Sequence, residues 1–208
     1  HCLDRVAAMI DAGAAAGFGF TTGTAGGFLG RYNRMLEGER LAANWRGWTT
    51  ACCVIERDLF NAVGGFSTSY TQYGFEDRDL VCELRAQAGD RDLQSLPELR
   101  ASHDAETSVH EIADKMFRSG RHSSGIFRQR WPEAYVETGY ARADVATASL
   151  PMRLVLRTAT WLRPALLAVT AGAVRRPGLP LAIGRPLLRL CSAASFFAGT
   201  LERDKTGD

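Results

Sequence analysis

Charge divides this chain into two parts. No Asp or Glu occurs between Asp144 and Glu202 in a sequence of 208 residues. The segment between them, 145–201, contains seven arginines, so its formal charge is +7. Residues 1–144 hold 16 basic and 20 acidic side chains, a net charge of −4. This division predicts two domains of different character, 1–144 and 145–208, and it excludes a uniformly basic nucleic-acid-binding protein.

The second part is expected to associate with a membrane. Leu154–Val174 and Leu179–Leu201 are apolar stretches interrupted by arginines, and their longest charge-free runs have 11 and 12 residues. A spanning helix needs about 20 apolar residues. Arginines at the rim of an apolar face are typical of helices that lie in the membrane interface. The sequence therefore predicts amphipathic membrane-associating helices, with 151–201 as the part that contacts the membrane.

Residues 1–144 alternate between strand-like runs and short helical patterns. Strands are predicted at 16–20, 48–55 and 92–96, the last closed by Pro97. Helices are predicted at 2–12, 28–43, 57–63, 77–88 and 107–119, with a further helical segment to residue 130. In the first helix Leu3, Val6, Ala7 and Ile10 form the apolar face, and Thr107 or Ser108 caps the fifth. This alternation predicts the α/β fold class.

Cysteine usage indicates a reducing compartment. The five cysteines are odd in number, Cys52 and Cys53 are adjacent, and no Cys-x-x-Cys pair occurs. Neither a disulfide framework nor a zinc knuckle is favoured by this pattern, which fits the cytoplasm.

The segment Val63–Leu80, VGGFSTSYTQYGFEDRDL, carries the most chemical information. A Gly-Gly-Phe turn and an aromatic-Gly-aromatic step precede Glu76 and Asp77, which open a predicted helix. The helix macrodipole and the free N–H groups at that end favour ionised carboxylates. Two such acids beside Tyr73 and Phe75 can accept a hydroxyl proton and hold a polyol against an aromatic face. The alternative is that Glu76 and Asp77 only cap the helix.

In the order of these motifs the chain resembles the C-terminal half of family 2 glycosyltransferases, which have the GT-A (Rossmann-like) fold. It is also similar to the C-terminal segment of the β-galactosyltransferases. The matching features are the strand Thr50–Ile55, Arg57, the turn Val63–Phe66, the motif Gly74–Asp77, Gly89, and the segment from Pro97 to His103. The resemblance covers about residues 1–140.

The resemblance implies an inverting, metal-dependent hexosyltransferase of polysaccharide biosynthesis. Its sugar would pass from a nucleotide-sugar donor to a hydroxyl of a lipid-linked or polysaccharide acceptor. Asp77 would be the general base and Glu76 would orient the acceptor hydroxyl, or these two roles are exchanged. The other candidate site residues are the substrate contacts Gly65, Phe66, Tyr73, Gly74 and Phe75 and the metal ligand His103. Trp48 is a further candidate substrate contact, because its ring could stack on a sugar. Core packing is the alternative for Trp48, and a loop histidine bonded to backbone is the alternative for His103.

In that family the nucleotide-binding strands and a metal-binding Asp-x-Asp precede the segment that matches residues 2–12. The chain is therefore expected to be a fragment, inactive alone, whose His103 would share a Mn or Mg ion with that upstream motif. The expected partners are a nucleotide-sugar, a glycan or lipid-linked acceptor and the cytoplasmic face of a bacterial cell membrane, with no nucleic acid. The competing hypothesis is a non-catalytic membrane-surface scaffold or interaction protein in which Glu76 and Asp77 are structural.

Overall fold

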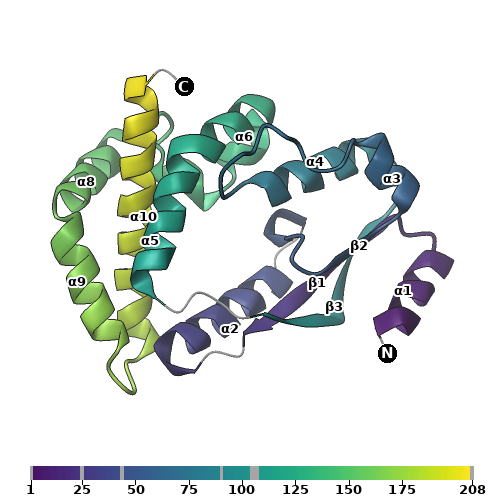
Figure 1. The fold of residues 1–208 in the computed structure, drawn as a ribbon, viewed down its shortest axis with the longest axis horizontal. Coiled ribbons are helices and arrows are strands. Elements are labelled where there is room, and N and C mark those ends of the chain that lie inside the picture. The colour runs from purple at the N-terminus through teal and green to yellow at the C-terminus, as the bar shows by residue number, and fades with distance from the viewer. Residues whose placement is uncertain (1, 24–25, 43–44, 90, 104–107, 207–208) are drawn as a thin grey trace. The chain divides into compact units, whose positions relative to one another are not determined.

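The computed structural model describes residues 2–23, 26–42, 45–89, 91–103 and 108–206. This part of the chain has a mixed α/β fold with one three-stranded sheet (Figure 1), so the predicted class is confirmed. The chain divides into two units that interleave along the sequence. Unit 1 contains His1–Thr24, Asn33–Ser67 and Glu76–Ala105, and unit 2 contains Ala25–Tyr32, Thr68–Phe75 and Glu106–Asp208.

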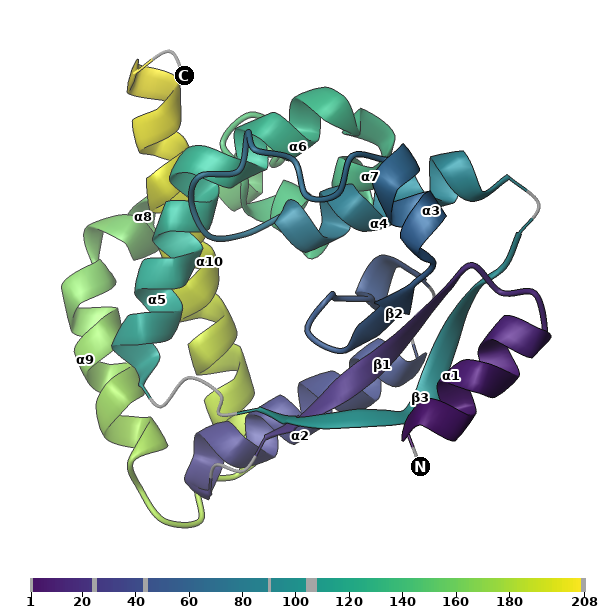
Figure 2. The same ribbon diagram turned by 45° about the vertical axis from the view of Figure 1, so that its right-hand side comes forward.

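The sheet belongs to unit 1, and strand β1 (Ala16–Gly23) is its centre. Strand β2 (Cys53–Ile55) pairs with β1 in the antiparallel sense, and β3 (Leu93–His103) pairs with it in parallel on the other side (Figure 2). β1 is buried from Ala16 to Phe20. A central strand is covered on both faces, which explains why its apolar residues are consecutive and do not alternate with polar ones.

Strand β3 continues through Pro97, where the sequence predicted its end. Proline lacks the N–H that a ladder bond requires, so it is tolerated on an edge strand or at an irregularity. β3 meets both conditions, because it lies at the edge of the sheet and its register against β1 shifts. Phe18 pairs with Ser95 whereas Phe20 pairs with Arg100, which places Pro97 inside the shift.

Two further expectations for unit 1 are corrected. Of the predicted strand 48–55, only Cys53–Ile55 pairs with a neighbour, and Trp45–Gly47 forms a 3-10 turn, η1. Helix α1 (Cys2–Asp11) forms as predicted, but the chosen apolar face was wrong. Leu3 and Ile10 are exposed, and the residue that α1 buries is Met9, which packs with Leu96 and Leu99.

The remaining helices that enter unit 1 agree with the sequence. They are α2 (Gly27–Ala42), whose first residues belong to unit 2, α3 (Arg57–Ala62) and α4 (Glu76–Ala88). Leu80, Val81 and Leu84 of α4 face inward as predicted, into a core that they share with Phe18 and Trp48.

Unit 2 is helical, and the apolar C-terminal segment is part of it. Its elements are α5 (Val109–Arg118), the π-helical turn η2 (Ser119–Ser123), α6 (Ser124–Arg130), α7 (Pro132–Val136), the 3-10 turn η3 (Gly139–Ala143), α8 (Leu150–Trp161), α9 (Arg163–Val174) and α10 (Leu181–Thr206). Ser108 caps α5 in a capping box with Glu111, and Thr107 lies outside the described residues. α10 packs on α5, η2, α8 and α9 (Figure 1), so the predicted boundary after residue 144 does not coincide with a boundary between units.

Two glycines bring α10 close to the backbone of the α5–η2 segment. A Cβ at Gly199 would meet the carbonyl oxygen of Phe117, and a Cβ at Gly120 would meet that of Phe196. Backbone carbonyls cannot rotate away as side chains do. The crossing therefore requires glycine at both positions.

Replacing Gly199 by alanine is expected to destabilise unit 2 by about 1–3 kcal/mol, because overpacking a close crossing forces backbone shifts. Gly172→Ala in α9 is the matched control, since a Cβ there meets nothing within 4 Å. Alanine at an open helical position gains up to about 1 kcal/mol over glycine. Urea unfolding followed by circular dichroism checks both, and a Gly199→Ala variant as stable as wild type would contradict the close crossing.

A buried ion pair joins the end of α10 to the segment before α8. The Arg203 guanidinium donates to Oδ1 of Asp144 at 2.8 Å and to Oγ of Ser124 at 2.6 Å. Tyr135 donates its hydroxyl to Oδ2 of Asp144 at 2.6 Å, and the Ala146 N–H donates to Oδ1 at 2.9 Å. Burial opposes ionisation of Asp144, but these hydrogen bonds outweigh it and hold the pKa of that carboxyl below its ordinary value.

Candidate active site

Nine residues were predicted to form the site, and the structure divides them between the two units. Six lie in unit 1: Trp48, Gly65, Phe66, Glu76, Asp77 and His103. Tyr73, Gly74 and Phe75 lie in unit 2.

The two acids occupy the first positions of α4, as the sequence predicted. Both are half-buried, and with Asp79 they give the first turn three acidic residues. The partial positive charge of a helix N-terminus stabilises ionised carboxylates there. Oε2 of Glu76 is buried. The Asp77 carboxylate is held by a hydrogen bond from a residue outside the helix.

That contact is a hydrogen bond from the Thr50 hydroxyl to Oδ1 of Asp77. Farther along the same helix, the Arg85 guanidinium lies over the Trp45 ring, 4.6 Å from its centroid. These two contacts lay the segment before β2 alongside α4. The Thr50 bond orients the Asp77 carboxylate, which keeps further lone pairs that can accept a proton.

Cys53 lies near Asp77, and its thiol has a raised pKa. Burial, followed by the Asp77 carboxylate and Cys52, raises the pKa of the Cys53 thiol to about 11. The thiolate is the nucleophilic form of cysteine, so at neutral pH this shift keeps the Cys53 thiol in its less reactive, protonated form. Chemistry at this end of α4 therefore depends on the carboxylates.

Trp48 is a core residue and does not present a surface to an acceptor. Its side chain is buried in the core cluster of unit 1. Its ring stacks on Phe18 with centroids 4.7 Å apart and planes 15° apart. The predicted acceptor contact at Trp48 is corrected to core packing, the alternative that the sequence left open.

The Gly-Gly-Phe turn has the left-handed backbone conformation that glycine favours. Gly64 and Gly65 have φ of 75° and 70°, a left-handed conformation that ends α3 after Ala62. Phe66 follows with 46% of its surface exposed, its ring edge-on to Phe60 at 6.4 Å. Phe66 thus remains an available apolar contact for a ligand, and Gly65 positions it.

In unit 2, the loop before α4 is anchored by the π-helical turn. The Ser123 hydroxyl lies 3.1 Å from the carbonyl oxygens of both Gln72 and Tyr73. Nζ of Lys115 lies over the Tyr73 ring, 5.2 Å from its centroid. The Tyr73 side chain remains 42% exposed, so its ring is an available stacking surface.

Gly74 and Phe75 are structural within this loop. Gly74 has φ of 107° and faces Ser119, and Phe75 has φ of 70°, which is unusual for a residue with a side chain. Phe75 is buried among aromatic rings, with the Phe127 centroid at 5.2 Å and the Tyr140 centroid at 5.1 Å. This packing holds the strained backbone in place. The predicted acceptor contact at Phe75 is therefore corrected to a core anchor.

His103 is exposed at the end of β3, opposite Gly23 of β1. Within the described ranges, no three His, Cys, Asp or Glu side chains lie close enough together to hold a metal ion. His103 therefore stays a predicted ligand.

Sequence reasoning missed two residues that fix the site. Thr50 and Asp77 are 27 positions apart, and Ser123 and Tyr73 are 50 apart. At such separations, no sequence pattern predicts that a hydroxyl side chain will contact a given residue. Only the tertiary fold brings them to their partners.

Comparison with known proteins identifies no family for this chain. No family model matches the chain, and no solved structure matches it. A protein of Sinorhizobium fredii, "Uncharacterized protein y4gI", is 29% identical over 114 residues, which are 51% of this chain and 12% of that protein. The chain thus spans a small part of the length of this relative.

Proposed function

We propose that this chain is the acceptor-side part of a GT-A glycosyltransferase that works on the cytoplasmic face of a bacterial cell membrane. The enzyme transfers a sugar from a nucleotide-sugar to a hydroxyl of a lipid-linked or polysaccharide acceptor, with inversion. The observation that carries the proposal is the half-buried Asp77 in the first turn of α4, oriented by the Thr50 hydroxyl.

The order of elements supports the same assignment. A short strand, β2, is followed by α3, by the left-handed Gly64–Gly65 turn and by a helix that begins at the acid pair. After that helix comes β3, which pairs in parallel with β1 and ends at His103. This is the order that the resemblance to family 2 glycosyltransferases implies for their C-terminal half.

In the proposed step, the Asp77 carboxylate accepts the proton of the acceptor hydroxyl while the hydroxyl oxygen attacks the anomeric carbon of the donor. The new carbon–oxygen bond forms as the bond from the anomeric carbon to the diphosphate oxygen breaks. The nucleoside diphosphate leaves with the electron pair of that bond. Glu76 orients the acceptor, and the exposed ring of Phe66, in the same unit, offers an apolar face for a sugar.

A second candidate function is that of a non-catalytic membrane-surface interaction protein. Its support is the burial of Trp48 and Phe75, which removes two of the six expected acceptor contacts from solvent. Under this reading the acids only stabilise the start of α4.

The two functions differ in one assay. The longest natural protein that contains this chain is incubated with UDP-, GDP- and dTDP-sugars and a membrane lipid or polysaccharide extract. Release of nucleoside diphosphate is then measured with and without the extract. The proposal expects acceptor-dependent release from at least one donor. Absence of release from every donor favours the interaction protein.

Thr50 gives a prediction of its own, because it orients the base without touching substrate. Thr50→Val is expected to lower kcat about tenfold and leave KM for the donor within about twofold, since one hydrogen bond to a charged group is worth about 1.5–3 kcal/mol. Thr50→Ser keeps the hydroxyl and should stay close to wild type. Steady-state kinetics of the two variants checks this, and equal losses in both would contradict a positioning role.

A further inference from the structure

Large apolar side chains are exposed on two consecutive helices of unit 2. They are Leu150, Leu154, Val155, Trp161, Leu162 and Val169, of which Trp161 is 81% exposed. We name this set the α8–α9 surface. Single exposed apolar residues are ordinary on soluble proteins, but a contiguous group marks an interaction site.

Helical spacing makes the α8 part of the surface contiguous. At 100° per residue, Leu150, Leu154 and Trp161 fall in one row along the helix, and Val155 lies on the adjoining side. Leu162 follows at the end of the helix. The opposite side of α8 carries Leu156, which is buried. The helix therefore uses one side for the core of unit 2 and presents an apolar side to solvent.

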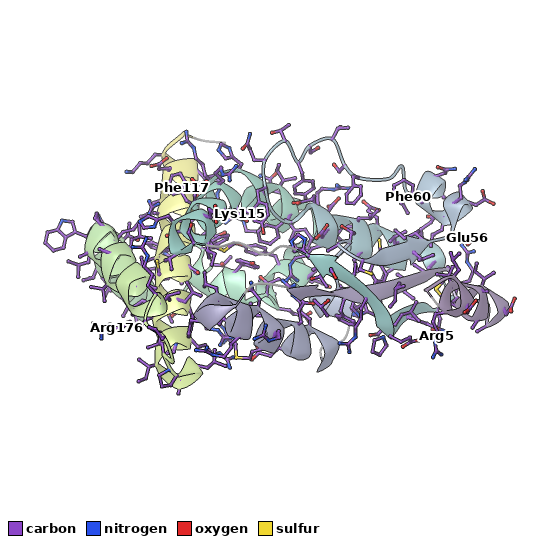
Figure 3. The ribbon with its side chains drawn as sticks, turned by 60° about the horizontal axis from the view of Figure 1, so that its bottom comes forward. Arg5, Glu56, Phe60, Lys115, Phe117 and Arg176 are labelled. Atoms are coloured by element: carbon purple, nitrogen blue, oxygen red, sulfur yellow. The ribbon has the colours of Figure 1, made fainter. Side chains whose placement is uncertain are left out.

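Arginines accompany this surface. Arg157 is exposed in α8, and Arg175 and Arg176 are exposed just after α9, where Figure 3 shows Arg176. No acidic residue occurs in 145–201, so these helices contain nothing that neutralises the arginines. An apolar face with arginines around it and tryptophan on it is complementary to an anionic lipid surface.

α10 is the helix whose length and composition suit a membrane span, over Leu181–Lys205. It is nevertheless an internal helix of unit 2: Ala194, Phe196 and Phe197 are at most 1% exposed. Near its end, Arg203 is held by the buried Asp144. Pulling α10 into a bilayer would break that ion pair and expose the core around it.

We propose that the α8–α9 surface docks on an anionic bilayer, with Trp161 at the level of the lipid headgroups and α10 remaining inside the protein. This inference rests on the membrane-surface part of the proposed function and does not depend on sugar transfer. The chain lies on the membrane through α8 and α9, and α10 does not span it, although it is long and apolar enough to do so.

The test uses the longest natural protein that contains this chain and vesicles of phosphatidylcholine with or without 25% phosphatidylglycerol, at about 0.1 M salt. Binding is measured by flotation. The double variant Leu154→Ser/Trp161→Ser is expected to bind the anionic vesicles at least tenfold more weakly. Val136→Ser is the matched control, since Val136 is equally exposed on α7, and it should bind as wild type.

A second pair of measurements keeps the test independent of folding. Arg175→Gln/Arg176→Gln, both at exposed positions, should weaken binding about 25-fold, or about fivefold for each arginine. Brominated lipid should quench tryptophan emission in wild type and much less in Trp161→Phe.

Four outcomes would overturn the proposal. They are binding unchanged in the Leu154→Ser/Trp161→Ser variant, equal binding to neutral vesicles, resistance of the bound protein to alkaline carbonate extraction as expected of a spanning α10, and self-association through this surface with no vesicle binding. None of these measurements requires enzymatic activity, so a failed docking proposal and a failed glycosyltransferase proposal are distinguishable.

Discussion

Replacing Asp144 by asparagine is expected to lower the free energy of unfolding of unit 2 by about 3–5 kcal/mol. The substitution removes the buried carboxylate that pairs with the Arg203 guanidinium at 2.8 Å, while the contact with the partly exposed Asp204 at 3.2 Å remains. Breaking a buried pair by removing one partner costs about that much. Both side chains are at most 2% exposed, so water cannot replace the lost partner. Hydrogen exchange of the α10 amides measures the loss directly in unit 2.

Asp114→Asn is the matched control for this substitution. Asp114 forms an ion pair with Arg118 at 3.0 Å on the exposed side of α5, with 62% of its side chain in solvent. Exposed pairs of this kind contribute about 0.5 kcal/mol or less. The double variant Asp144→Asn/Arg203→Met should recover part of the stability, because it also removes the buried guanidinium with which Asp144 pairs. Equal effects of Asp144→Asn and Asp114→Asn would contradict a buried ion pair.

The same pair predicts how stability depends on pH. The pKa of Asp144 is lower in the folded protein than its ordinary value of 3.8, so the native state binds the proton less readily than the unfolded chain. Its contribution is therefore complete above about pH 4 and is lost as pH falls through the lower native pKa. Acid unfolding of Asp144→Asn should show a shallower slope below pH 4 than that of wild type.

The sequence predicted most helices because local signals place them. The Ser108–Glu111 capping box, the Gly64–Gly65 ending and the inward row of α4 are all readable from neighbouring residues. The face of α1 and the length of β3 were wrong because partners distant in sequence decide them. Met9 packs on Leu96 and Leu99, and the shifted register of an edge strand accommodates Pro97.

The acid pair could likewise be predicted, since Glu76 and Asp77 lie at a helix start and carry their own signal. Their surroundings could not. The sequence does not distinguish an aromatic residue that stacks on a sugar from one that packs in a core. Trp48 and Phe75 both pack in cores. The charge division located an apolar, arginine-bearing segment, but only the packing of α10 reveals which of its helices stay exposed.

Asp77→Asn is expected to lower kcat for sugar transfer by about 10²–10⁴, the usual contribution of a positioned general base. Asparagine has the shape of aspartate and can still accept the Thr50 hydrogen bond, but its amide cannot take the acceptor proton. KM for the nucleotide-sugar should change little, because the proposal gives Asp77 no contact with the donor.

Asp58→Asn separates catalysis from helix stability. Asp58 is the second residue of α3, as Asp77 is of α4, and it is exposed. Both substitutions remove one favourable charge from a helix N-terminus, worth about 0.3–1 kcal/mol. A loss of stability or activity that both variants share is due to the lost charge at the helix N-terminus. A loss of activity in Asp77→Asn alone is due to the loss of the general base.

The most direct test of the proposed mechanism is the rate of acceptor-dependent nucleoside diphosphate release by wild type, Asp58→Asn and Asp77→Asn, at equal concentrations of the whole protein. The mechanism predicts similar rates for the first two and a rate at least about 100-fold lower for Asp77→Asn. An Asp77→Asn variant that turns over as fast as Asp58→Asn would contradict it and leave the acids with a structural role.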